Sequence, residues 1–182
     1  MTLILTLGVA SVYADEHSVK MRFSGTAGNS ANNLQQPNTS NDEDNFAGNG
    51  TLGSFTVRNV RAISNSPAPP PSSCSGANQL YLTEPAGGGV FRFDDGSLLY
   101  LSLTQGADCI DLTNPTFECT LIFKITGGTG RFRNASGVLT MTEAGVTVLS
   151  DANSNPVLFG ATGEFTGTIS GIREEEKHDS AQ

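Results

Sequence analysis

The sequence has no tryptophan, and its only histidines, His17 and His178, stand near opposite ends of the chain. A triad hydrolase needs a histidine beside its nucleophile inside the fold. Zinc sites draw on histidines and paired cysteines, and the three cysteines form no Cys-x-x-Cys pair. These absences exclude a hydrolase triad, and the residues predict no metal site and no cofactor.

Basic residues are also scarce, because 10 lysines and arginines face 18 acidic residues and give a net charge of -8. Nucleic-acid binding needs clustered lysine and arginine against the phosphates. A membrane-spanning helix needs about 20 consecutive apolar residues, and no such run is present. We therefore expect no nucleic-acid partner and no membrane association of the mature protein.

The first 14 residues are largely apolar and end at Ala14, just before the charged Asp15. This pattern is typical of a signal peptide and its cleavage site, although the usual basic start is missing, as in a truncated segment. The alternative is a first β-strand. The prediction is a secreted or periplasmic protein with one domain over 15–172 and a flexible acidic tail over 173–182.

Cysteine spacing suggests a disulfide bond, as expected in an exported protein. Cys109 and Cys119 bracket a turn-rich segment and are the predicted pair. Cys74 bonded to Cys109 is the main competitor, and buried free thiols are the remaining alternative.

Apolar residues alternate with polar ones along most of the chain. The clearest case is 117–126, where Phe117, Leu121 and Phe123 share one face with two further apolar residues, while Glu118 lies on the other face. Weaker alternation occurs in 20–27, 52–63, 79–83, 90–93, 97–104, 137–142, 145–149 and 163–170. Short strands separated by glycine turns predict an all-β antiparallel barrel or sandwich.

Two segments lack this alternation. Residues 28–50 are rich in asparagine, and residues 64–76 contain four of the eight prolines. The first predicts a mobile surface loop, and the second predicts an extended, polyproline-like loop between strands.

Residues 122–137 read Ile-Phe-Lys-Ile-Thr-Gly-Gly-Thr-Gly-Arg-Phe-Arg-Asn-Ala-Ser-Gly. This stretch resembles the strand, glycine turn and strand of the dirigent and allene oxide cyclase-like barrels. The resemblance implies an eight-stranded antiparallel, calycin-like β-barrel, commonly a homotrimer, whose lumen binds small apolar molecules. Gly127, Gly128 and Gly130 would let the backbone turn sharply, and Phe132 would plug one end of the barrel.

Candidate site residues follow from the same pattern. Leu121, Phe123, Phe91 and Leu101 are the predicted ligand-binding residues of the lumen. The catalytic candidates are Glu118, Glu164 and Tyr100, taken from a wider set that also holds Glu84, Asp94, Asp95, Glu143, Tyr81 and Arg92. These are the side chains left for acid–base chemistry when histidine is absent from the fold.

The predicted function is a secreted, non-enzymatic barrel that binds a small apolar ligand or acts as a stable scaffold. One alternative is a dirigent or allene oxide cyclase-like isomerase or cyclase acting in the lumen. Another is a structural or adhesive surface protein that works through its asparagine-rich loop and acidic tail. The direction of Phe123 discriminates between the first two, because Glu118 faces outward if Phe123 faces the lumen.

Overall fold

The computed structural model describes residues 15–173, which form nine strands and two short 3-10 helices. In chain order these are β1 (Glu16–Asn29), β2 (Thr39–Gly50), β3 (Phe55–Ser64), η1 (Ser72–Cys74), β4 (Gln79–Thr83), β5 (Ala86–Phe93), β6 (Leu98–Asp111), β7 (Thr116–Gly128), η2 (Gly130–Phe132), β8 (Ser136–Ser150) and β9 (Pro156–Ser170). Within the described part of the chain, no helix is long and apolar enough to cross a membrane.

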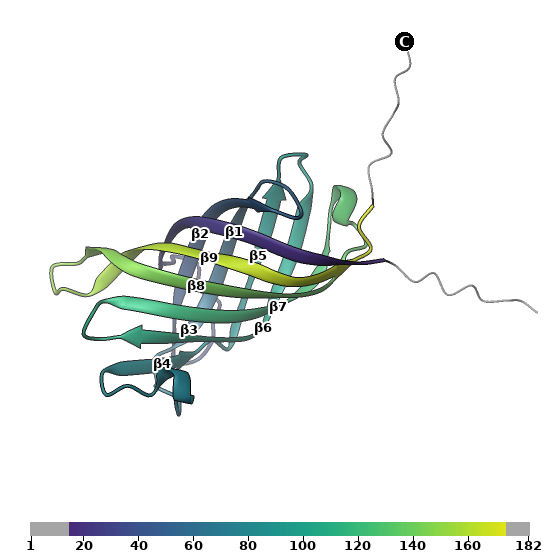
Figure 1. Cartoon of the computed structure of the whole chain (residues 1–182). Helices are drawn as coiled ribbons and strands as arrows, with labels where there is room; N and C mark the ends of the chain where they lie inside the picture. The colour runs from purple at the N-terminus through teal and green to yellow at the C-terminus, as the bar shows by residue number, and fades with distance from the viewer. Residues whose placement is uncertain (1–14, 174–182) are drawn as a thin grey trace, which may run out of the picture.

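Eight of the strands close into one barrel (Figure 1). The order β6-β5-β3-β2-β1-β9-β8-β7 returns to β6 through the β6–β7 pairing, and every pairing is antiparallel. The remaining strand, β4, pairs with the last part of β6. The predicted all-β, eight-stranded antiparallel barrel is therefore confirmed, with β4 as an addition.

Strand β2 corrects the loop expected over 28–50. The connection between β1 and β2 occupies only residues 30–38, and β2 pairs with both β1 and β3. Its inward positions include buried Asp44 and Phe46, while Asn45 is exposed. The sequence alternation of β2 was hard to recognise, because Asp44 occupies an inward-facing position that is apolar in most strands.

Aromatic side chains fill the half of the barrel nearest η2. Phe132 is fully buried, with its ring 4.8 Å from that of Phe93. The Arg131 guanidinium lies 4.6 Å from the Phe132 ring and donates a hydrogen bond to the Leu52 carbonyl at 2.5 Å. Gly130 begins η2 with a φ of 57°, a backbone conformation that favours glycine. This end of the barrel is therefore closed by packed side chains.

The disulfide joins Cys74 to Cys109, with Cα atoms 5.8 Å apart, and Cys119 is a buried free thiol. The predicted Cys109–Cys119 bond was wrong. In the β6–β7 register Cys119 lies opposite Asp108, whereas Cys109 lies opposite Glu118. Side chains alternate between faces along a strand, so the two cysteines lie on opposite faces of the barrel wall and cannot meet.

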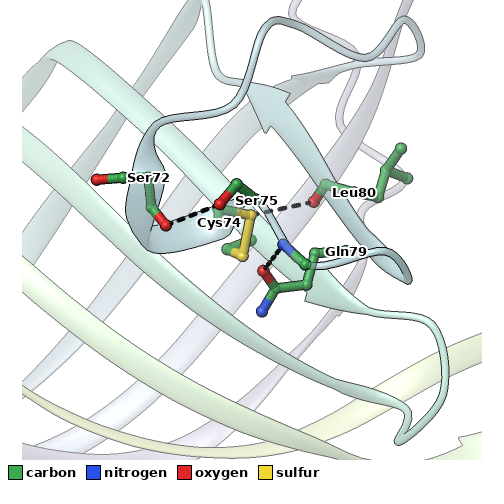
Figure 2. The surroundings of a disulfide bond; sticks show 7 residues. Ser72, Cys74, Ser75, Gln79 and Leu80 are labelled. Atoms are coloured by element: carbon green, nitrogen blue, oxygen red, sulfur yellow. Dashed lines mark hydrogen bonds between the residues drawn. A yellow bond between two sulfur atoms is a disulfide. The ribbon is translucent and has the colours of Figure 1, made fainter.

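The bond fastens the proline-rich connection to the barrel. Figure 2 shows Cys74 at the end of η1, with Ser75 donating a hydrogen bond to the Ser72 carbonyl at 3.0 Å. The Gln79 side chain accepts a hydrogen bond from the Gly76 backbone N–H at 2.8 Å. The segment 64–76, expected to be an extended loop, contains the short helix η1 and is covalently anchored to β6 through Cys109.

Replacing Cys74 and Cys109 together by serine should lower the free energy of unfolding by about 2–4 kcal/mol, because the unfolded chain regains the freedom of a 35-residue loop. Thermal unfolding followed by circular dichroism measures the change. Cys119→Ser alone is the control and leaves that loop closed. An unchanged melting temperature in the double variant would show that the bond does not restrain the fold.

Candidate functional site

The half of the lumen farthest from η2 is open. A cavity of about 450 Å³ lies where β6 turns into β7 and β8 turns into β9. Its wall is mainly apolar and includes Ile63, Ile110, Phe117 and Phe159. Arg61 and Asp108 also line it and connect it to a charged cluster deeper in the barrel. The lumen is therefore divided into a filled half and an open half.

Arg61 stands at the centre of the charged cluster. It follows Phe55, Val57 and Asn59 at alternate positions of β3, so its side chain points into the lumen. That side chain is only 2% exposed. Its Nη1 donates a hydrogen bond to Glu84 Oε1 at 2.8 Å.

Three further carboxylates surround the same guanidinium. Arg61 Nη2 donates to Asp44 Oδ1 at 3.0 Å. Asp108 Oδ1 lies 3.7 Å from Nη1, and Glu143 Oε2 lies 4.0 Å from Nη2. Four carboxyl groups thus converge on one cation, and burial makes any uncompensated charge costly.

Strand register brings these residues together from distant parts of the chain. Cys119 on β7 lies opposite Asp108 on β6 and opposite Glu143 on β8. Glu84 stands at the break between β4 and β5, where its backbone N–H donates to the Gly106 carbonyl at 2.8 Å. A Cβ on Gly106 would lie 3.0 Å from that of Glu84, so glycine leaves the room that Glu84 needs.

Burial controls the ionisation of the acids. It raises the pKa of Glu143 to about 8, with added repulsion from Asp44 outweighing Arg61. Burial also raises the pKa of Glu84 well above its usual range and that of Asp44 above its ordinary value. Asp42, at the cavity wall, has its pKa raised to about 6 by burial. Glu143 therefore keeps a proton near neutral pH and can act as a hydrogen-bond donor.

The Cys119 thiol belongs to this cluster but is poorly reactive. Its Sγ lies 3.0 Å from Arg61 Nη1 and 3.5 Å from Glu84 Oε1. Burial, together with the nearby Asp108 carboxylate, raises the pKa of the thiol well above its usual value. A thiol that stays protonated is a weak nucleophile.

Glu84, Asp108 and Cys119 each place one donor atom within 4.8 Å of the others, a grouping that could hold a metal ion. Residue spacing does not indicate this grouping, since the usual cysteine and histidine spacings of metal sites are missing. Arg61 Nη1 already contacts two of the three residues, at 2.8 Å and 3.0 Å. The guanidinium thus supplies the positive charge that a metal would bring.

A larger hollow, of about 780 Å³, lies at the opposite end of the barrel, beside Asp95 and Arg131. It is a surface feature, and Arg131 is already paired there, because its Nε lies 3.0 Å from Asp95 Oδ2. The cavity above Arg61 is better suited to a small molecule, because it is walled by apolar side chains and ends on unsatisfied acids.

The predicted ligand-binding residues point inward but do not line the cavity. Leu121, Phe123 and Phe91 are fully buried, and Leu101 is 6% exposed, all within the packed core. The expectation that these four side chains line the pocket is corrected, because they pack in the filled part of the lumen, and of the apolar face over 117–126 only Phe117 borders the cavity.

The predicted catalytic residues lie outside the lumen. Glu118 is exposed, as expected once Phe123 points inward. Glu164 forms a surface ion pair with Lys20 at 3.6 Å, and Tyr100 is half-buried on the outer side of β6. None of the three can act on a molecule in the cavity.

Two other acid–base candidates from the sequence, Glu84 and Glu143, do lie together beside Arg61. Sequence reasoning missed Arg61, Asp44 and Asp108, and assigned Cys119 to a disulfide. The sequence did contain a sign of this cluster, since Arg61 lies on the same inward-facing side of β3 as Phe55 and Val57. A charged residue at such a position indicates a polar group inside the barrel.

No protein-family model and no curated protein sequence matches the chain. Among solved structures, the pterocarpan synthase dirigent protein PsPTS1 is similar at 13% identity, with a TM-score of 0.47, over 88% of this chain and 97% of its own. The pterocarpan synthase dirigent protein GePTS1 is similar at 12% identity, with a TM-score of 0.43, over 93% of this chain and 92% of its own.

The resemblance indicated by the Gly-Gly-Thr-Gly-Arg-Phe turn is confirmed at the level of fold. Strand number, antiparallel pairing and closure are those of the predicted dirigent-like barrel.

Proposed function

We propose that this dirigent-like barrel binds one small, largely apolar molecule in the open half of its lumen. The observation that carries the proposal is the cavity of about 450 Å³, a volume in the range of small-molecule sites. The wall would bury the apolar body of the ligand, and the charged floor would bind a polar group.

The distribution of side chains in the wall supports an oriented ligand. The Phe117 and Phe159 rings stand edge to face, with centroids 5.1 Å apart, and both border the cavity. Arg61 and Asp108 lie at its deeper end, next to the buried acids. A molecule with one apolar and one polar end therefore fits in one direction only.

The filled half of the barrel gives the site a rigid base. Phe91 and Phe165 pack at 4.9 Å between ring centroids, and both are fully buried. A charge introduced at Leu121 or Phe123 would disrupt this core, so such variants report on folding and not on binding. Tests of binding must therefore change the cavity wall.

Filling the cavity mouth should remove binding. Ser40 is an exposed lining residue on β2, and tryptophan there would occupy the space without breaking the core. We expect a fluorescent apolar dye to bind the unmodified protein at one molecule per chain and to lose at least about tenfold in affinity with Ser40→Trp.

Thr56→Trp is the matched control, because Thr56 is exposed on β3 and lies outside the cavity lining. Equal dye binding by the two variants and the unmodified protein would contradict the proposal.

An enzymatic role, as an isomerase or cyclase, is the second candidate. Asp42 faces the cavity with a pKa raised to about 6 by burial, a value that suits general acid–base catalysis near neutral pH. The two roles differ in what Asp42→Asn would do, since an enzyme would lose turnover while retaining substrate affinity. The adhesive alternative has less support, because β2 takes much of the asparagine-rich segment into the barrel.

Export and assembly are part of the proposal. A disulfide in the folded domain fits an oxidising, secreted or periplasmic location. The predicted signal peptide over 1–14 and most of the tail over 173–182 lie outside the described residues. A homotrimer is supported by the outer face of β8, where Val138, Val146 and Val148 are exposed.

A further inference from the structure

The cavity has a surplus of negative charge. Asp42, Asp108 and Asp111 line it, and Arg61 is the only basic residue among its lining residues. Arg61 is already engaged below the cavity, through hydrogen bonds to Asp44 and Glu84. Its positive charge is therefore shared among more acids than it can neutralise.

Asp108 has one carboxylate oxygen without a hydrogen-bond partner among residues 15–173, and the neighbouring Glu84 carboxyl shares a hydrogen bond with its side chain. Its side chain is 6% exposed, and Oδ1 is buried without a hydrogen-bond partner. The nearest cationic atom recorded, Arg61 Nη1, is 3.7 Å away, which is too long for a hydrogen bond. A buried acceptor without a donor destabilises the fold, so this position favours a donor supplied from the cavity.

Asp42 provides a second acceptor facing the same space. It lies opposite Arg61 in the β2–β3 register, and its carboxylate has no hydrogen bond or ion pair among residues 15–173. Asp111 differs, because its Oδ1 already accepts from the backbone N–H groups of Thr113 at 2.8 Å and Asn114 at 3.1 Å. Asp42 and Asp108 are thus the carboxylates available to a ligand.

We propose that the ligand carries a protonated amine on an apolar body, and that Asp42 and Asp108 bind the ammonium group. This inference rests on the proposed function, because it assigns the chemistry of the same cavity. Ammonium N–H groups form charge-assisted hydrogen bonds with carboxylates, and the Phe117 and Phe159 rings suit an apolar or aromatic body. Arg61 Nε is also without a partner, but the four carboxyl groups around the guanidinium disfavour an anion.

Three probes of equal length isolate the charge of the polar end: 4-phenylbutylamine, 4-phenylbutan-1-ol and 4-phenylbutyrate. Isothermal titration calorimetry at pH 7.5 should show the amine binding at least about tenfold more tightly than the alcohol, and the carboxylate more weakly than either. Asp108→Asn should remove most of the preference for the amine over the alcohol. Asp42→Asn should reduce the same preference and gives an independent test if Asp108→Asn fails to fold.

Glu118→Gln is the control, because it removes a carboxylate from the outer face of β7, outside the cavity lining, and it should leave the preference unchanged. Equal binding of amine and alcohol by the unmodified protein would overturn the amine assignment while retaining the pocket. Tighter binding of the carboxylate would overturn it in favour of an anion at Arg61. Failure of all three probes to bind, together with failure of the apolar dye, would overturn the proposed function itself.

Discussion

Replacing Arg61 by methionine is expected to lower the free energy of unfolding by about 3–5 kcal/mol at pH 8. The substitution keeps an unbranched side chain in the lumen but removes the cation that contacts Asp44 and Glu84. Four buried carboxyl groups would then face one another without compensation, and the cost of ionising them would oppose folding.

Urea denaturation measures this change, and acidification should reduce it. At pH 5 the carboxyl groups of Arg61→Met can take up protons, so the deficit relative to the unmodified protein should be smaller than at pH 8. Arg58→Met is the control, because Arg58 pairs with Glu43 at 2.7 Å with its side chain 59% exposed. It should cost about 1 kcal/mol or less. Similar losses in the two variants would show that the Arg61 cluster has no special role in stability.

The second large effect is the dependence of stability on Glu143. Burial raises the pKa of this group from 4.5 to about 8, so the folded protein holds a proton that the unfolded chain releases above pH 4.5. The stabilisation from this group is therefore complete below pH 4.5 and is lost as the pH rises toward 8. The slope can reach about 1.4 kcal/mol per pH unit within that window.

Glu143→Gln should remove much of this slope and stabilise the protein at pH 8, because glutamine imitates the protonated acid. Unfolding free energies measured from pH 4 to pH 9 test the expectation. Glu118→Gln is the matched control on the outer face of β7, and it should leave the slope unchanged. A Glu143→Gln profile that parallels that of the unmodified protein would show that Glu143 is not the group that takes up the proton.

The effects expected for Arg61 and Glu143 arise from the same buried cluster of charges. Although burial lowers the pKa of the Arg61 guanidinium, Asp44 and Glu84 raise it well above its usual value, so the residue stays charged. One permanent cation surrounded by several acids of raised pKa leaves protons in the cluster at neutral pH. The open half of the lumen thus ends on groups that can donate or accept a hydrogen bond.

The sequence by itself determined the class of fold. Alternation over 117–126 specified β7, because a strand buried on one face must repeat with period two. The Gly-Gly-Thr-Gly-Arg-Phe turn indicated an eight-stranded barrel and the end closed by Phe132. These features depend on residues close together in the chain, and local patterns report them well.

Tertiary structure decided the disulfide and the site. Cys74 reaches Cys109 because β4 pairs with β6, a non-consecutive pairing that composition does not reveal. Arg61, Asp108 and Glu143 meet because β3, β6 and β8 curve around one lumen. Alternation places Arg61 and Glu143 inward, but Asp108 faces inward because the register shift between Leu103 and Gln105 reverses the alternation of β6. Only the closed barrel decides which inward-facing side chains lie at the same height.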